Sequence, residues 1–157
     1  MEPLTVVLTT NETELNQCAE LMSTSEPFVK LRFDYDRCCS AVRGDYKEVY
    51  LAKIGTTFAG FVVLQFYGPL RGYIQTICVG HEYRGKGIGT SLLKFSEAKL
   101  LKLFPNVFMC VTSFNDRAQK LYYRLGYEKV GVLKDHIIYG ADEYILRKQG
   151  CPISEFK

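Results

Sequence analysis

The spacing of apolar residues along the chain predicts alternating strands and helices. Leu4–Thr9 is a short apolar and β-branched run, which is typical of a strand. The next apolar residues recur at i, i+3, i+4 and i+7, as on one buried face of a helix: Leu15, Cys18, Ala19 and Met22. Asn11 is placed to cap this helix, and a second short helix is predicted within residues 34–43.

The rest of the pattern predicts further strands around two longer helices. In chain order they are strands over 49–54, 57–67 and 73–79, a helix from about 88 to 104, a strand over 107–112, a helix over 116–125, and strands over 127–133 and 143–147. A helix joins strands 73–79 and 107–112, so they should be parallel neighbours. We therefore expect an α/β fold with a mixed sheet, in a single domain over residues 1–157 whose core spans about 4–148.

Composition is that of a globular protein and excludes several classes. Hydrophobic residues make up 47% and charged residues 24%, which argues against disorder. No apolar run approaches the roughly 20 residues that span a bilayer, and residues 1–4 lack the basic start of a secretory signal. We expect a cytoplasmic protein with reduced thiols and no membrane contact. With two histidines and no C-x-x-C pair, no metal site is expected.

The net charge of +3 hides an uneven distribution. Residues 1–70 hold 6 basic and 9 acidic side chains, residues 71–134 hold 11 and 4, and residues 135–157 hold 3 and 4, so the three nets are −3, +7 and −1. The balance excludes a strongly basic nucleic-acid binder. The basic middle faces either an anionic ligand or only solvent.

A glycine-rich turn, Arg84-Gly85-Lys86-Gly87-Ile88-Gly89, follows a predicted strand and opens a predicted helix. Bare amides at a helix N-terminus, with the positive end of the helix dipole, form a cradle for phosphates. A P-loop is disfavoured because Gly87 stands where Ser or Thr would bind magnesium, and Thr90 breaks the dinucleotide fingerprint. The plain alternative is a tight turn that requires glycine.

This loop is similar to the R/Q-x-x-G-x-G/A loop of the GNAT superfamily of N-acetyltransferases. Residues 115–122, followed by Gly126-Tyr127, resemble that family's N-x-x-A-x-x-L-Y-x-x-x-G-F/Y segment. The resemblance implies a GNAT-like fold: a mostly antiparallel mixed sheet, flanked by about four helices, with one parallel strand pair splayed around the cofactor. It also implies direct transfer of an acetyl group from acetyl-CoA to a primary amine of a small molecule or of a peptide or protein. The alternative is a non-catalytic acyl-CoA-binding regulatory module.

The resemblance also implies roles for individual residues. Backbone amides of the loop would hold the pyrophosphate, and the strand before it would pair with the pantetheine arm, usually with a bulge. The implied cofactor-binding residues are Ile77, Cys78, Val79, Arg84, Gly85, Lys86, Gly87, Ile88, Gly89, Thr90, Asn115, Ala118, Lys120 and Tyr122. Arg117 and Arg124 could also reach the phosphates. Cys78 and Cys110 are interpreted as small core residues.

Tyr122 matches the tyrosine that protonates the departing thiolate, although it also fits an apolar helix face. The general base is less clear, because strand 73–79 carries no carboxylate. Our hypothesis is a water relay to which Tyr73, Glu26 or Glu143 contributes.

The acceptor site should lie among residues 25–28, Tyr35 and a turn over Lys134–Asp142. The acidic first 70 residues would suit a cationic amine. We expect a monomer or a homodimer.

Overall fold

The computed structural model describes residues 2–157 and contains one seven-stranded mixed sheet, in the order β1-β2-β3-β4-β5-β7-β6. The strands are β1 (Leu4–Thr9), β2 (Lys47–Ile54), β3 (Thr57–Gln65), β4 (Tyr73–Val79), β5 (Asn106–Thr112), β6 (Glu128–Ile138) and β7 (Ala141–Gln149). The helices are α1 (Glu12–Ser23), α2 (Tyr35–Ala41), α3 (Ile88–Leu100) and α4 (Asp116–Arg124), with short 3-10 helices η1 (His81–Tyr83) and η2 (Ile153–Glu155). The predicted mixed α/β fold is confirmed.

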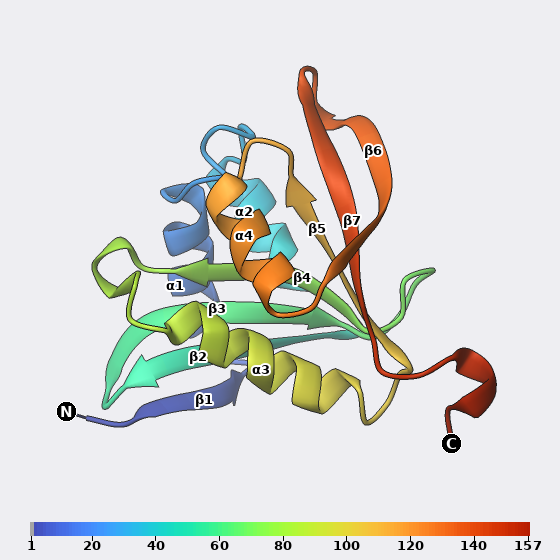
Figure 1. The fold of residues 1–157 in the computed structure, drawn as a ribbon. Coiled ribbons are helices and arrows are strands. Elements are labelled where there is room, and N and C mark those ends of the chain that lie inside the picture. The colour runs from blue at the N-terminus through green and yellow to red at the C-terminus, as the bar shows by residue number, and fades with distance from the viewer. Residues whose placement is uncertain (1) are drawn as a thin grey trace.

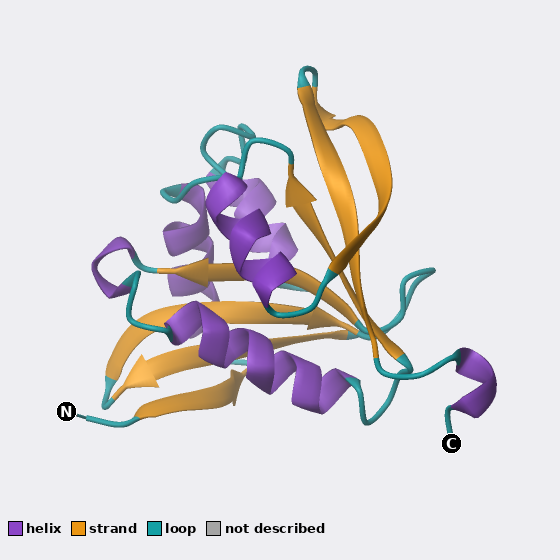
Figure 2. Cartoon of the chain, in the orientation of Figure 1, coloured by secondary structure: helices purple, strands orange, loops and turns teal. Residues whose placement is uncertain are grey.

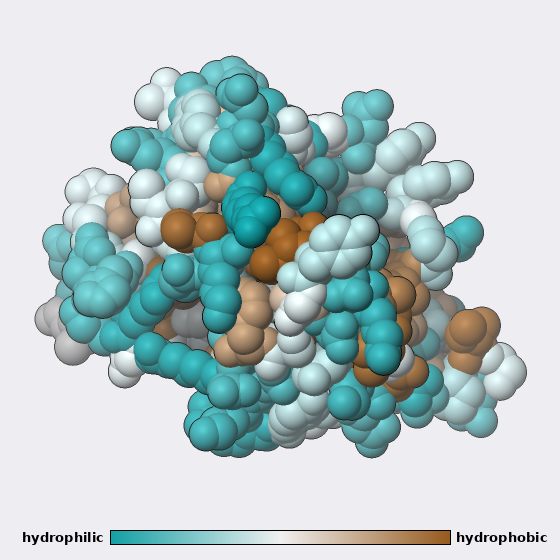
Figure 3. Space-filling model, turned by 90° about the horizontal axis from the view of Figure 1, so that it is seen from above, coloured by the Kyte–Doolittle hydropathy of each residue, from teal (hydrophilic) through white to brown (hydrophobic). Residues whose placement is uncertain are grey.

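The four α-helices cover the two faces of the sheet in pairs (Figure 1). α3 and α4 pack on one face, where Leu92 and Leu93 meet Val62 and Ile74. α1 and α2 pack on the other face, above a second core that includes Phe61. Because side chains alternate across a strand, each sheet residue belongs to one face or the other. Figure 3 shows the end of the molecule toward which β5 and the β6–β7 hairpin run. Apolar side chains gather near the centre of this surface, and hydrophilic side chains surround them.

β4 and β5 are parallel neighbours only where both begin. Their pairing is limited to Tyr73 with Phe108 and Ile74 with Met109, after which the strands separate. β5 then turns away together with the β6–β7 hairpin (Figure 2). The bulge expected in β4 is also present: Val63 faces Thr76 while Leu64 faces Ile74, so Gln75 is the extra residue. The expected splayed parallel pair is therefore part of the fold.

Element ends differ from the sequence prediction in the last hairpin. The turn expected over Lys134–Asp142 is wrong, because β6 continues to Ile138 and β7 begins at Ala141. The pairing is irregular between Leu133 and Ile138, which interrupts the apolar alternation and made the segment resemble a loop. α3 also ends at Leu100, not near 104, in a turn that precedes Pro105.

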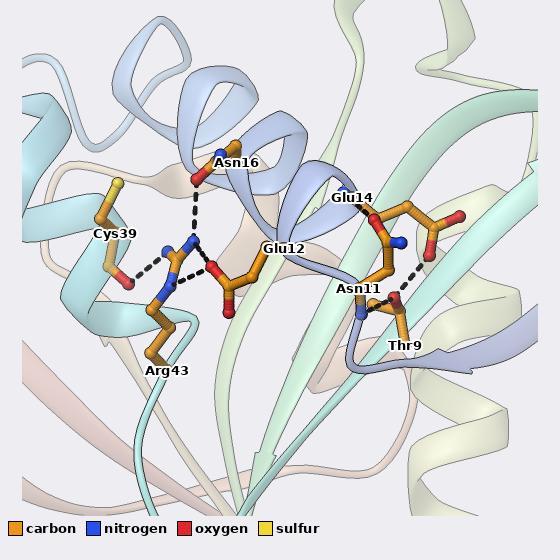
Figure 4. A network of polar contacts seen from close by, with 7 residues as sticks. All are labelled: Thr9, Asn11, Glu12, Glu14, Asn16, Cys39 and Arg43. Atoms are coloured by element: carbon orange, nitrogen blue, oxygen red, sulfur yellow. Dashed lines mark hydrogen bonds and ion pairs between the residues drawn. The ribbon is translucent and has the colours of Figure 1, made fainter.

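A single arginine ties α1 to the end of α2 (Figure 4). The guanidinium of Arg43 donates to the Glu12 carboxylate at 2.7 Å, to the side-chain oxygen of Asn16 at 2.8 Å and to the carbonyl of Cys39 at 3.1 Å. At the start of α1, the Asn11 side chain accepts from the Glu14 amide at 3.1 Å, as a helix cap does. These bonds fix the two helices that flank the loop over residues 24–34.

We expect Arg43→Met to lower the free energy of unfolding by about 1–2 kcal/mol, because several hydrogen bonds between the two helices are lost together. For a domain of this size the melting temperature should fall by about 2–6 °C. Lys94→Met, at an exposed position of α3, is the control and should change it little. Thermal unfolding followed by circular dichroism measures both, and equal melting temperatures for the two variants would contradict this role of Arg43.

Candidate functional site

A cleft of about 780 Å³ opens where β4 separates from β5, on the face covered by α3 and α4. Its walls come from the end of β4, the glycine-rich loop, the first turn of α3, and α4. The predicted site residues that line it are Glu26, Ile77, Cys78, Val79, Arg84, Gly85, Gly87, Ile88, Gly89, Thr90, Asn115, Ala118, Lys120 and Tyr122. The structure thus brings together segments that lie far apart in the sequence.

The glycine-rich loop presents bare backbone to this cleft. Gly85 and Gly87 have φ values of +76° and +81°, which L side chains rarely adopt, and no atom lies within 4 Å of a Cβ added at either position. Gly87 is the N-cap of α3 and brings no side chain to the helix end. The first amides of α3 therefore lack helical partners and face a space that a side chain would fill. No acidic residue lies in the first turn, so this end of the helix favours an anion.

Two basic residues of the loop do not project freely into the cleft. Arg84 Nε donates to the carbonyl oxygen of Val79 at 3.1 Å, which ties the loop to the end of β4. Lys86 is absent from the cleft lining, and its ammonium lies 5.7 Å from the ring centre of Tyr83. The structure therefore does not place Lys86 in the cleft lining with the other predicted loop residues. Arg84 acts first as a structural link between strand and loop.

α4 forms the wall of the cleft opposite the glycine-rich loop and supplies most of the basic side chains that line the cleft. Arg117, Lys120 and Arg124 line the cleft from successive turns, with Asp116 as an opposing acidic group. Asn115 caps the helix by accepting from the Ala118 amide at 3.3 Å, and it lines the cleft as well. The capping alternative weighed for Asn115 is therefore correct and compatible with a ligand contact.

Tyr122 lies between the core and the cleft. It is half-buried, packs edge-on against Tyr127 with ring centres 6.2 Å apart, and lines the cleft. Burial raises the pKa of its hydroxyl to about 12, because a phenolate would lose its hydration there. The phenol is consequently protonated at neutral pH and can donate a proton or a hydrogen bond. The neighbouring Tyr123 is exposed and does not line the cleft.

A separate polar cluster lies on the other face of the sheet. Glu143 on β7 is only 5% exposed and accepts a hydrogen bond from the Thr112 hydroxyl of β5 at 2.5 Å. Burial raises the pKa of Glu143, while the Thr112 hydrogen bond and the nearby His136 act in the opposite direction. Burial and the side chain of Cys110 hold the pKa of Tyr73 far above its usual range, and Glu143 contributes in the same direction.

The three candidate bases are thus divided between two places. Tyr73 and Glu143 share the polar cluster, whereas Glu26 lies at the cleft, where its carboxylate accepts from the Lys30 amide at 3.2 Å. Cys110 is half-buried beside Tyr73, so the interpretation of this thiol as a plain core residue is wrong. Cys78 is buried in the second core and also lines the cleft.

Sequence reasoning missed three residues of the cleft: Tyr83, Asp116 and Leu121. Leu121 follows Ala118 by three positions on α4, so helical periodicity could have found it. Tyr83 lies in η1, between strand and loop, where periodicity gives no signal. Among residues 2–157, no group of three or more His, Cys, Asp or Glu side chains is arranged to hold a metal ion, and no helix is long and apolar enough to cross a membrane.

Comparisons with known proteins agree with this geometry. The sequence model of the Acetyltransferase (GNAT) family matches residues 13–127. The N-alpha-acetyltransferase RimI of Mycobacterium tuberculosis is 27% identical over 157 residues, which cover 94% of this chain and 93% of that protein. An uncharacterized Mycobacterium leprae protein is also 27% identical, but the chain spans only 41% of its length.

Solved structures show the same fold. The ribosomal-protein-S18-alanine N-acetyltransferase of Escherichia coli superposes with a TM-score of 0.79 at 17% identity, over 98% of this chain and 97% of that one. Naa50 of Arabidopsis thaliana, in complex with the bisubstrate analogue CoA-Ac-MVNAL, gives 0.72 at 23% identity, over 93% and 98%. The chain belongs to the GNAT family of acetyltransferases, and the acyltransferase class and GNAT-like fold inferred from its two motifs are confirmed.

We expect Gly87→Ala to weaken CoA binding about tenfold or more, because the new methyl group occupies the space before the α3 amides. Gly140→Ala is a matched control: Gly140 has φ +82° and equally open surroundings, but it lies in the last hairpin, away from the cleft. Both variants bear a similar backbone strain of about 1–2 kcal/mol. Calorimetric titration with CoA should separate them, and an equal loss of affinity in both would argue against the cradle.

Proposed function

We propose that this protein transfers the acetyl group of acetyl-CoA directly to a primary amine of a small molecule or of a peptide or protein. The observation that carries the proposal is the cleft at the β4–β5 separation, which combines bare helix amides, a basic wall and the protonated Tyr122. The family supports acyl transfer, and solved relatives contain CoA or a CoA–peptide analogue.

In this proposal the cofactor lies along the cleft. The pyrophosphate is held by the amides of Ile88, Gly89 and Thr90, with Gly85 and Gly87 leaving the approach open. Arg117, Lys120 and Arg124 neutralise the remaining phosphate charge. The pantetheine arm enters the gap and pairs with backbone near Ile77 and Val79, since β4 has no strand partner on its β5 side there.

The chemistry follows from these positions. A neutral amine attacks the thioester carbonyl, and the resulting oxyanion is stabilised by strand amides near the bulge of β4. The carbon–sulfur bond then breaks, and Tyr122 protonates the departing thiolate. The amide product and free CoA are released without a covalent enzyme intermediate.

The acceptor amine is mostly protonated at neutral pH, so a base must take its proton. We assign this step to the polar cluster of Tyr73 and Glu143, reached through water, because Tyr73 lies on one strand of the open pair and Glu143 is paired with Thr112 of the other. Glu26 is the weaker candidate, since its carboxylate already accepts a backbone hydrogen bond. The two solved acetyltransferases described above favour a peptide or protein N-terminus as the acceptor.

A non-catalytic acyl-CoA-binding module would have the same phosphate cradle. Free thiol release from acetyl-CoA, measured with a panel of small amines and peptides, separates the two functions. Turnover that depends on the amine supports the transferase. Tight CoA binding without turnover on any amine would favour the module.

We expect Tyr122→Phe to lower kcat about 100-fold, because the thiolate loses its proton donor, while CoA affinity changes little. Tyr123→Phe is the matched control and should keep full activity, since Tyr123 lies outside the cleft. The pKa of about 12 also implies no loss of rate through Tyr122 ionisation below about pH 10. Steady-state kinetics of both variants measure this, and unchanged kcat in Tyr122→Phe would contradict the assignment.

Glu143→Gln should stabilise the protein at neutral pH while lowering its activity. The raised pKa means that the folded state binds the Glu143 proton more tightly than the unfolded state does, so stability falls as pH rises through the folded value. Glutamine keeps an acceptor for Thr112 but cannot ionise. The gain in melting temperature should therefore be absent near about pH 4 and present at about pH 7. Glu155→Gln, at an exposed position, is the control, and a pH-independent gain would contradict the burial effect.

A further inference from the structure

The irregular segment of β6 presents a histidine to which neither motif assigns a role. Leu133 faces Glu143 and Ile138 faces Ala141, so four residues of β6 lie opposite the single residue Asp142 of β7. His136 is one of these four and is exposed to solvent. A bulge of this kind redirects side chains that a regular strand would point elsewhere.

Side-chain to backbone hydrogen bonds hold this bulge in shape. The Asp135 amide donates to the Asp142 carboxylate at 3.2 Å, and the Asp135 carboxylate accepts from the Gly140 amide at 2.7 Å. Asp142 is itself fixed to the β5–α4 connection, because its amide donates to the Ser113 hydroxyl at 3.1 Å and its carbonyl accepts from the Ser113 amide at 2.8 Å. Asp135, which directly precedes His136, has a φ of +48° and so adopts the left-handed backbone conformation. The position of His136 is therefore built into the hairpin.

The register of the hairpin brings this bulge alongside the buried carboxylate of the polar cluster, since Leu133, at the start of the bulge, is paired with Glu143. Glu143 is 5% exposed, and the groups around it are Tyr73 from β4, Thr112 and Cys110 from β5, and His136 from β6. Tyr73 and Thr112 are held as neutral donors at physiological pH, and burial raises the pKa of the Cys110 thiol. His136 is consequently the one member of this described set that is exposed, and an imidazole can accept a proton at one ring nitrogen and donate one from the other.

A buried base needs a route by which its proton returns to water. In each turnover the acceptor ammonium loses two protons: the first before its nitrogen attacks, and the second when the amide forms. The departing thiolate takes up one proton. One proton per turnover must therefore leave the enzyme. Glu143 is too enclosed to release it directly.

We propose that His136 carries this proton from the Glu143 carboxylate to solvent. The inference rests on the proposed function. In the step, the O–H bond of protonated Glu143 breaks as an N–H bond forms on the imidazole, and the imidazolium then gives a proton to water or buffer. Glu143 is left ionised for the next acceptor, and no oxidant, metal or further reactant is required. His136 acts through Glu143 and is not assigned contact with the substrate.

His136→Ala tests the route, and added imidazole provides the readout specific to proton transfer. We expect kcat to fall about tenfold or more, and to recover in proportion to imidazole concentration up to a plateau. CoA affinity and melting temperature should stay at the values of the unsubstituted protein, because His136 is exposed and does not line the cleft. The chain offers one matched control, His81→Ala, since His81 is the other of its two histidines and is exposed in η1. It should keep its rate with and without imidazole.

Three outcomes would overturn the route while leaving the transferase intact. These are an unchanged kcat in His136→Ala, a lowered kcat that imidazole does not restore, and restoration that occurs equally in His81→Ala. If the unsubstituted protein binds CoA but releases no thiol with any amine, the proposed function fails and the route fails with it. Because CoA binding and turnover are measured on the same samples, the two kinds of failure are distinguishable.

Discussion

The separation of β4 from β5 after two paired residues is the constraint on which the site depends. A continued parallel ladder would satisfy the backbone groups of both strands and leave no gap. Here the bulge at Gln75 and the departure of β5 with the last hairpin leave β4 paired only with β3 over its second half, so its other edge is open. The cleft, the loop that follows β4 and the polar cluster on the other face are all arranged around that opening.

The two faces of the opening have different chemistry. On the α3 and α4 face, bare amides and basic side chains suit a polyphosphate, and Tyr122 is protonated by burial. On the α1 and α2 face, the buried Glu143 carboxylate lies with Thr112 and Tyr73 in a polar cluster. In the proposed mechanism, the sheet that is open at this point places the proton donor and the proton-accepting cluster on opposite sides of the reacting carbonyl.

Much of the fold and of the cofactor cleft could be predicted from sequence, because both follow from local patterns. The loop over Arg84–Gly89 and the segment over Asn115–Tyr122 each lie on one continuous stretch, and helical or strand periodicity fixes their neighbours. The polar cluster could not be assembled in this way. Tyr73, Cys110 and Glu143 lie on three strands, and only the register of β5 with β7 brings Thr112 opposite Glu143. The bulge of β6 concealed its strand because it breaks the alternation that predicts strands.

The irregular pairing of β6 with β7 also bears on how such a chain can diversify. At the bulge between Leu133 and Ile138, β6 has three more residues than β7, yet the pairing of β7 with β5 is uninterrupted from Asn106 to Thr112. Insertions or deletions within residues 134–137 therefore leave the register of the central sheet unchanged. Within the proposed function, such changes in length fall on the expected acceptor side, away from the loop and helices that line the cleft.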